Sequence, residues 1–314
     1  KYFIMNLSVV IPVYNSFSIV SKLVSNLSEE ILKIKKISSY QIILVNDCSN
    51  DNSWEEILKI CGKEQFVIGI NLMKNYGQHN ALMAGIKIAD GDYIITMDDD
   101  FQHSPKEIKK ILEKMDEGFD VCYTNYKNNK YNAFKIFSSG LNNKISNILI
   151  NKPKNIYLSS FKCFTKKVCN EIKKYEGPFV YIDGLIFDIT KNVSCVDIEH
   201  LDRMTGSTNY NIFKLISLWL RVLTNFSIVP LRISTITGFF MTIVSFCSIL
   251  IIVIIKVLNP TIAAGWASII SVLLFFSGLQ FIVLGLIGEY IGRSYLNLNK
   301  KPQFVVREYK NLKN

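Results

Sequence analysis

The sequence predicts an α/β protein whose mainly parallel sheet is covered by helices on both faces and is followed by a separate, strongly apolar region. Two patterns lead to this prediction. From residue 7 to residue 124, short apolar runs rich in β-branched residues alternate with segments of helical periodicity, which is the organisation of parallel sheets. After residue 230, two long stretches contain no charged residue. The 314 residues are enough for one globular domain and this additional unit.

The expected elements follow one another regularly along the chain. Five runs are expected to form strands: Leu7–Ile11, Gln41–Val45, Gln65–Ile70, Asp92–Met97 and Phe119–Thr124. Helices are expected between them: Phe17–Leu32, Trp54–Ile60, Gly77–Ala89 and a helix that begins at Ser104 and Pro105. Further strand and helix are expected around Lys162–Ile172 and Val193–Ile198.

Composition narrows the possible functions. The formal net charge is +10, with 49% hydrophobic and 20% charged residues, which does not fit a disordered chain. The positive charge suits a membrane surface or a phosphorylated substrate, and no nucleic-acid-binding motif accompanies it. The seven cysteines are odd in number and form no Cys-x-x-Cys pair, so neither a disulfide framework nor a zinc site is expected.

Three polar clusters follow expected strands directly: Tyr14-Asn15, Asn46-Asp47 and Asp98–Asp100. Ligands of open parallel sheets bind beyond the carboxyl ends of the strands, so these clusters are expected along one edge. Asp47 fits either a nucleotide base or ribose, or the ordinary capping of a helix. Gly77 and Gln78 open a helix whose amide end either faces a phosphate or is a plain cap.

The aspartate run is the strongest local motif. Side chains alternate in extended chain, so Asp98 and Asp100 are expected to point the same way, with Gln102 continuing that alternation. Hard oxygen ligands on one side suit Mg²⁺ or Mn²⁺, with phosphate oxygens of a substrate completing the shell. Asp99 is expected to point elsewhere, towards a ribose hydroxyl. The alternative is a solvated acidic turn.

The C-terminal region predicts a membrane anchor. Residues 211–231 are amphipathic and suit either a helix in the membrane interface or a helix packed on the globular domain. The charge-free stretches 233–255 and 266–288 are each long enough to span a bilayer, and together they predict a transmembrane hairpin with spans at about 233–256 and 266–288. Basic residues flank the hairpin on both outer sides and only Lys256 lies in its loop, so the domain 5–210 and the tail 291–314 are expected in the cytoplasm.

Taken together, these motifs resemble those of the inverting family 2 glycosyltransferases, which have the GT-A fold. The resemblance rests on Pro12-Val13-Tyr14-Asn15, Val45–Asp51, Asn75–Gln78 and the aspartate run with Phe101–Pro105. Within this family the chain is most similar to the polyprenyl-phosphate glycosyltransferases, such as dolichyl-phosphate mannose synthase and the bacterial undecaprenyl-phosphate glucosyltransferases. Gly288–Arg293, after the second apolar stretch, resembles the bacterial members with two spans.

The resemblance implies a role for each matched position. The residues implied to hold the nucleotide are Pro12, Tyr14, Asn15 and Asp47, and the residue pattern itself adds Gln78 and Asp99. The implied metal ligands are Asp98, Asp100 and Gln102. The residues implied to meet the lipid phosphate are Arg203, Ser207 and Lys162, and the catalytic set comprises Asp98, Asp100, Arg203 and Lys162. This sequence departs from the common family pattern with Asn46 for Asp, Asp99 for Ala, and Ser160-Phe161-Lys162 for Gly-Phe-Arg.

The expected activity is metal-dependent inverting transfer of a sugar from a nucleoside diphosphate to undecaprenyl phosphate at the bacterial inner membrane. UDP-glucose is the first choice of donor, and UDP-N-acetylglucosamine and UDP-galactose are alternatives. A processive polysaccharide synthase is a further alternative, although its usual Gln-x-x-Arg-Trp motif is absent from the sequence. A catalytically inactive membrane scaffold is another, against which the intact aspartate run argues. The partners expected are the nucleotide sugar, undecaprenyl phosphate and membrane lipids, with a homotetramer as the expected assembly.

Overall fold

The computed structural model describes residues 4–126, 156–178, 180–198, 236–240, 265–299 and 301–312, together with isolated positions between 243 and 258. The chain divides into two compact units. The first comprises Lys1–Asn209 with Lys300–Asn314, and the second comprises Tyr210–Asn299. The chain therefore leaves the first unit once and returns to it at its C-terminal end.

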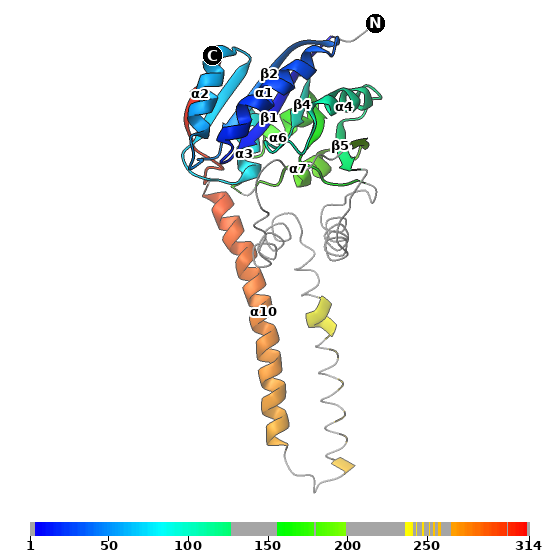
Figure 1. Cartoon of the computed structure of the whole chain (residues 1–314). Coiled ribbons are helices and arrows are strands. Elements are labelled where there is room, and N and C mark those ends of the chain that lie inside the picture. The colour runs from blue at the N-terminus through cyan, green and yellow to red at the C-terminus, as the bar shows by residue number, and fades with distance from the viewer. Residues whose placement is uncertain are drawn as a thin grey trace. The chain divides into compact units, whose positions relative to one another are not determined.

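The first unit is built on a mixed sheet, of which Figure 1 labels β1, β2, β4 and β5. The sheet has eight strands in the order β7-β5-β6-β4-β1-β2-β3-β8. The central strands β4, β1, β2 and β3 are parallel, whereas β6 and β8 run antiparallel to their neighbours β4 and β3. The strands are β1 Met5–Val13, β2 Ile37–Asn46, β3 Val67–Leu72, β4 Tyr93–Thr96, β5 Val121–Tyr126, β6 Lys162–Thr165, β7 Val193–Ile198 and β8 Val306–Lys310.

Helices cover both faces of this sheet, as the continuous apolar character of the central strands requires. The helices are α1 Phe17–Leu32, α2 Ser53–Lys63, α3 Gln78–Ile88, α4 Ile108–Met115 after the short 3₁₀ helix η1 Pro105–Glu107, α6 Lys166–Lys173 and α7 Ile182–Ile189. Alternate residues of β1 separate the two faces. Val9 and Ile11 belong to the core beneath α1, α2 and α4. Val10 meets α3 at Gly85, where a Cβ would collide with the valine side chain.

The strand order creates a switch point beside β1. The chain runs from β1 to β2 and β3 on one side and then crosses to β4 on the other. Because the loops after β1 and β4 leave in opposite directions, a crevice opens at their carboxyl ends, which is the usual ligand site of such sheets.

The predicted strands and helices of the first 124 residues are confirmed, with boundaries that differ by a few residues. The expectation of more strand and helix around 162–172 and 193–198 is confirmed by β6, α6 and β7. The sequence does not predict two of the observed elements. No helix is predicted where α7 lies, and β8 lies within 291–314, for which a cytoplasmic tail is predicted. Instead, β8 pairs with β3 and closes that edge of the sheet.

The second unit contains the 33-residue helix α10, Trp266–Leu298, which includes the second apolar stretch of the sequence. Most of the first stretch and the amphipathic segment 211–231 lie outside the described residues. Among the helices that the structure describes, none meets the combined requirement of length and apolarity for crossing a bilayer. The transmembrane hairpin therefore stays a prediction.

Candidate active site

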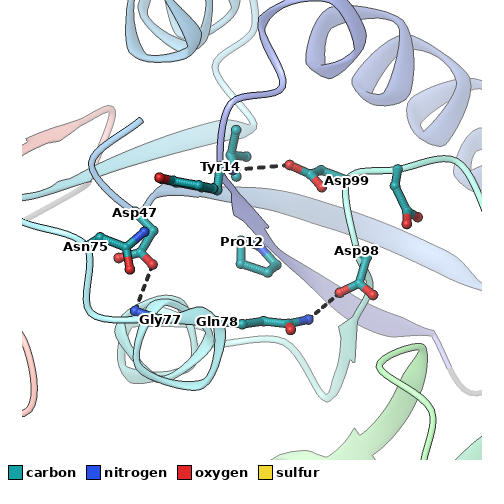
Figure 2. A pocket seen from close by; sticks show the side chains of 10 residues that line it. Pro12, Tyr14, Asp47, Asn75, Gly77, Gln78, Asp98 and Asp99 are labelled. Atoms are coloured by element: carbon teal, nitrogen blue, oxygen red, sulfur yellow. Dashed lines mark hydrogen bonds between the residues drawn. The ribbon is translucent and has the colours of Figure 1, made fainter. Parts of the chain in front are cut away.

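A pocket of about 290 Å³ lies at the carboxyl edge of the sheet, at the switch point beside β1 (Figure 2). It is formed where β1, β2 and β4 end and where the chain enters α3. The lining residues are Pro12, Val13, Tyr14, Asp47, Asn75, Gly77, Gln78, Asp98, Asp99 and Asp100. The prediction that the polar clusters of three strands share one edge is therefore confirmed for Tyr14, Asp47 and the aspartate run.

Each of the four described loops next to the pocket, after β1, β2 and β4 and before α3, contains one residue with positive φ. Asn15 follows β1 with φ 55°, Cys48 follows β2 with φ 54°, Gly77 precedes α3 with φ 85°, and Phe101 follows β4 with φ 58°. This conformation costs a non-glycine residue roughly 1–2 kcal/mol. Such strain persists where surrounding contacts fix the chain, and it is concentrated at functional sites.

Asp47 fixes the loop that leads into α3. Its two carboxylate oxygens accept hydrogen bonds from the backbone N–H groups of Tyr76 at 2.7 Å and Gly77 at 2.8 Å. Burial raises the pKa of Asp47, and these two hydrogen bonds oppose that rise. Because both of its oxygens accept these hydrogen bonds, the carboxylate fixes the loop that lines the pocket before α3.

Asp98 faces the start of α3 and strand β6. Its oxygens accept hydrogen bonds from Gln78 Nε2 and Ser160 Oγ, both at 2.6 Å. His103 lies behind Ser160, with 3.1 Å between Nε2 and Oγ. Burial opposes ionisation of Asp98, but the interactions with His103 and Ser160 outweigh it and hold its pKa below the ordinary value. The side chain is therefore a carboxylate at neutral pH.

Asp99 turns away from Asp98, as the sequence analysis expected, and contacts the loop after β1 (Figure 2). Its Oδ2 accepts hydrogen bonds from Tyr14 N at 3.2 Å and Ser16 Oγ at 2.5 Å. Burial, with a smaller contribution from the charges of Asp98 and Asp100, raises the pKa of Asp99 to about 6. The ribose contact expected for Asp99 stays a prediction. Within the protein, the Asp99 side chain connects the end of β4 to the loop after β1.

The chain after β4 is not extended, so strict alternation of side chains does not apply there. The strand ends at Thr96, Phe101 is left-handed, and Gln102 N donates a hydrogen bond to Asp100 Oδ1 at 3.2 Å. Gln102 is not among the residues that line the pocket. Its expected place beside Asp98 and Asp100 in a metal shell therefore stays a prediction, and alternation alone does not supply the reason for it.

The charge of the pocket suits a cation. Four of its lining residues are aspartates, and none of the described lining residues is a lysine or an arginine. Within the described part of the chain, no group of three His, Cys, Asp or Glu residues is placed to hold a metal by itself. Two carboxylates with an incomplete shell are what Mg²⁺ or Mn²⁺ uses when phosphate oxygens of a substrate supply the remaining ligands.

Lys162 is buried in an ion pair. Its side chain is only 2% exposed and its ammonium is paired with Asp183, and the expected contact with the acceptor phosphate stays a prediction. Tyr123 Oη donates a hydrogen bond to the same carboxylate oxygen at 2.8 Å. Burial and the adjacent carboxylate raise the pKa of Tyr123 well above its ordinary value, so the hydroxyl stays protonated. In this arrangement the lysine charge is already neutralised inside the protein.

The remaining acceptor residues, Arg203 and Ser207, lie outside the described residues. The sequence alone assigned no role to four contributors to the site: Ser16, Asn75, His103 and Ser160. Asn75 and His103 lie within the quoted motifs and Ser16 follows one, but Ser160 meets Asp98 across 62 residues of sequence and His103 across 57. No local pattern announces such contacts.

The comparisons with known proteins agree with this architecture. Residues 8–173 match the family Glycosyl transferase family 2, and residues 229–294 match the GtrB C-terminal hairpin. The first match covers more than half of the chain, so the chain belongs to glycosyl transferase family 2.

Similar proteins narrow the class further. The undecaprenyl-phosphate 4-deoxy-4-formamido-L-arabinose transferase of Proteus mirabilis (strain HI4320) is 30% identical over 314 residues, covering 97% of this chain and 94% of that protein. The transferase with the same name from Salmonella choleraesuis (strain SC-B67) is 33% identical over 312 residues, with the same coverage. The protein is therefore a glycosyltransferase that acts on a polyprenyl phosphate.

A solved structure supports the fold independently. Glucosyl-3-phosphoglycerate synthase from Mycobacterium tuberculosis, crystallised with Mn²⁺, UDP-glucose and phosphoglyceric acid, superposes with a TM-score of 0.52 at 14% identity. The match covers 70% of this chain and 78% of that one. At this level of identity the likeness establishes the GT-A-like fold alone.

Proposed function

We propose that this enzyme transfers a sugar from a nucleoside diphosphate to undecaprenyl phosphate, with inversion at the anomeric carbon. The observation that carries the proposal is the pocket at the switch point beside β1, with four aspartates and no basic residue among its described lining. A diphosphate alone would be repelled there, whereas a diphosphate bound with a divalent cation would be attracted. The names of the relatives support the lipid acceptor.

Each group of candidate residues has a proposed role. Pro12, Tyr14, Asn15, Asp47, Gln78 and Asp99 are proposed to hold the nucleotide. Asp98, Asp100 and Gln102 are the proposed ligands of Mg²⁺ or Mn²⁺, and the similar synthase has been crystallised with either ion. The bound ion would stabilise the charge that develops on the departing diphosphate. Arg203 and Ser207 are proposed to orient the acceptor phosphate.

The reaction needs no strong general base. A phosphomonoester has a second pKa of about 6 and is largely dianionic at neutral pH, so it is already a nucleophile. Its oxygen attacks the anomeric carbon while the bond from that carbon to the nucleoside diphosphate breaks. The protein then has to position the two substrates and shield their charges.

We further propose that the second unit anchors the enzyme in the bacterial inner membrane as a hairpin, with the catalytic unit in the cytoplasm. The pairing of β8 with β3 supports an even number of crossings, because both ends of the chain belong to the same sheet. The match to the GtrB C-terminal hairpin supports the same arrangement. A homotetramer is the proposed assembly, which light scattering of the detergent-solubilised protein measures.

The donor is tested with a panel of nucleotide sugars. UDP-glucose is the proposed donor, and UDP-N-acetylglucosamine, UDP-galactose and UDP-4-deoxy-4-formamido-L-arabinose are included, the last because of the names of the relatives. Purified full-length protein is incubated with undecaprenyl phosphate, Mn²⁺ and each donor, and the lipid product is identified by mass. A polymer in place of a single lipid-linked sugar would overturn the proposal.

Asp100→Ala tests the metal site in the same assay. Transfer is expected to be abolished, because one of two carboxylates that face the cation is lost. Asp90→Ala is the matched control, because Asp90 lies at the exposed amino edge of the sheet, in a surface ion pair with Lys166. Near-normal transfer by the Asp100 variant would contradict the metal assignment.

A further inference from the structure

A row of polar side chains crosses three neighbouring strands at one level of the sheet. Asn46 on β2 is the register partner of Asn71 on β3, and Asn71 is the register partner of Glu308 on β8. Asn46 Nδ2 donates a hydrogen bond to Asn71 Oδ1 at 2.9 Å, and Asn71 Nδ2 donates one to Glu308 Oε1 at 3.2 Å. The two asparagines are 3% and 6% exposed, so their amides depend on each other for partners.

Glu308 sets the direction of this row. An ionised carboxylate only accepts hydrogen bonds, so Asn71 must turn its Nδ2 group towards it. The oxygen of the Asn71 amide then faces Asn46, which donates a hydrogen bond to it from its own Nδ2 group. Trp54 Nε1, which only donates, bonds the same Glu308 oxygen at 2.7 Å and holds the carboxylate in place.

The inner end of the row reaches the loops at the pocket. Because Asn46 donates outwards, its Oδ1 is turned towards Ser49 and accepts a hydrogen bond from Ser49 Oγ at 2.6 Å. Ser49 Oγ in turn accepts the backbone N–H of Asn15 at 3.0 Å, and Asn15 Oδ1 accepts the N–H of Asn50 at 2.8 Å. The left-handed turn after Tyr14 is therefore tied to the loop after β2.

We propose that Glu308 is a positioning residue for the nucleotide, acting from the C-terminal strand through Asn71, Asn46 and Ser49 on the loop that carries Tyr14 and Asn15. The proposal rests on the proposed function, which assigns the nucleotide to these loops. It also gives a physical reason for an amide at position 46, which donates to Asn71 and accepts from Ser49. With Glu308 at the other end, only a side chain that both donates and accepts fits that place.

Asn46→Asp tests the direction of the row. The introduced carboxylate faces the oxygen of the Asn71 amide, and Asn71 cannot turn round because Glu308 also requires its Nδ2 group. Adding Glu308→Gln removes this conflict once Asn71 has reversed. The amide Nε2 at position 308 then donates to Asn71, and the amide turns so that its Oε1 keeps the hydrogen bond from Trp54 Nε1, which in the wild type shares one Glu308 oxygen with Asn71. Asn46→Asp with Glu55→Gln is the matched control, since Glu55 is an exposed residue of α2 outside the row.

Two quantities are measured for the full-length protein: the KM and kcat for the nucleotide sugar, and the midpoint of thermal unfolding. Asn46→Asp is expected to raise KM about tenfold with little change in kcat. The reason is that the hydrogen bond from Asn46 to Asn71 is replaced by two acceptor oxygens that face each other. Glu308→Gln added to it should restore both KM and the midpoint to within about threefold and a few degrees of wild type. Glu55→Gln added to it should restore neither.

The outcomes separate the row from the proposed function. If the double variant with Glu308→Gln recovers neither the KM nor the unfolding midpoint relative to Asn46→Asp, the proposed direction of the hydrogen bonds along the row is wrong. If it recovers the unfolding midpoint while no variant changes KM, the row is structural and the positioning role is wrong. If wild-type protein neither binds UDP with Mn²⁺ in a calorimeter nor transfers sugar, the proposed function fails, and the unfolding midpoints alone still test the row.

Discussion

Replacing Lys162 with methionine separates its two possible roles, as a buried structural charge or as a contact for the acceptor phosphate. The lysine side chain is 2% exposed and pairs with Asp183, whose side chain is 10% exposed. In Lys162→Met, the Asp183 carboxylate keeps the Tyr123 hydroxyl but loses its counter-charge. Removing one partner of a buried pair costs roughly 3–5 kcal/mol. At roughly 2–4 °C per kcal/mol for a domain of this size, unfolding is expected about 6–20 °C earlier.

A second substitution tests the cause of that loss. In Lys162→Met with Asp183→Asn, no charge is left buried, and the amide oxygen still accepts the Tyr123 hydroxyl. Most of the lost stability is therefore expected to return, so the two substitutions are not additive. Lys166→Met is the matched control, because Lys166 is 45% exposed in its pair with Asp90 and its loss is expected to cost less than about 1 kcal/mol.

The assay is thermal unfolding of detergent-solubilised protein followed by near-ultraviolet circular dichroism, together with KM for undecaprenyl phosphate. A folded Lys162→Met protein of normal stability with a greatly raised KM for the lipid would refute this reasoning. It would show that the ion pair opens during turnover and that Lys162 contacts the acceptor phosphate.

Three further predictions concern other parts of the fold. The pKa of Asp99 is raised from 3.8 to about 6, so the folded protein holds a proton between these values that the unfolded chain lacks. Its contribution to stability is therefore lost as the pH rises through about 6. In metal-free protein, Asp99→Asn should make the free energy of unfolding less dependent on pH between 3.8 and about 6. Gly85→Ala should destabilise the protein by about 1–3 kcal/mol in urea unfolding, because the new Cβ meets the buried Val10 side chain, whereas Gly62→Ala has open space and should not destabilise. Burial raises the pKa of Cys61 to about 11, so peptide mass spectrometry after alkylation of native protein at pH 8 should find Cys48 modified well before Cys61; equal labelling would show that α2 opens.

Local patterns in the sequence were sufficient for the alternating strands and helices of the first 124 residues. Each strand is a short, continuous apolar run, and each helix carries its buried residues at helical spacing, so both can be recognised without knowledge of their neighbours. The polar clusters could be placed at one edge for a similar reason. Carboxyl ends of parallel strands meet at the same edge whatever the order of the strands.

Other features depend on which strands become neighbours. β8 is a short, mostly exposed run that becomes a strand because β3 offers it a free edge. The direction of the Asn46 amide depends on Glu308, which lies 262 positions further along the chain and reaches it only through Asn71. The burial of Lys162 depends on Asp183, which comes from a helix that the sequence did not announce.

The sequence by itself determined that this chain is an α/β protein whose motifs resemble those of glycosyl transferase family 2, with an acidic motif after the fourth strand. Those properties depend on the spacing and the type of residues over short stretches of the chain. Only the tertiary structure decided which aspartate oxygens are already engaged, that Asp99 ties β4 to the loop after β1, and that a lysine with a recognisable motif position is neutralised inside the protein. The physical reason is that hydrogen-bond and ion-pair partners are set by distance in space, which sequence separation does not encode.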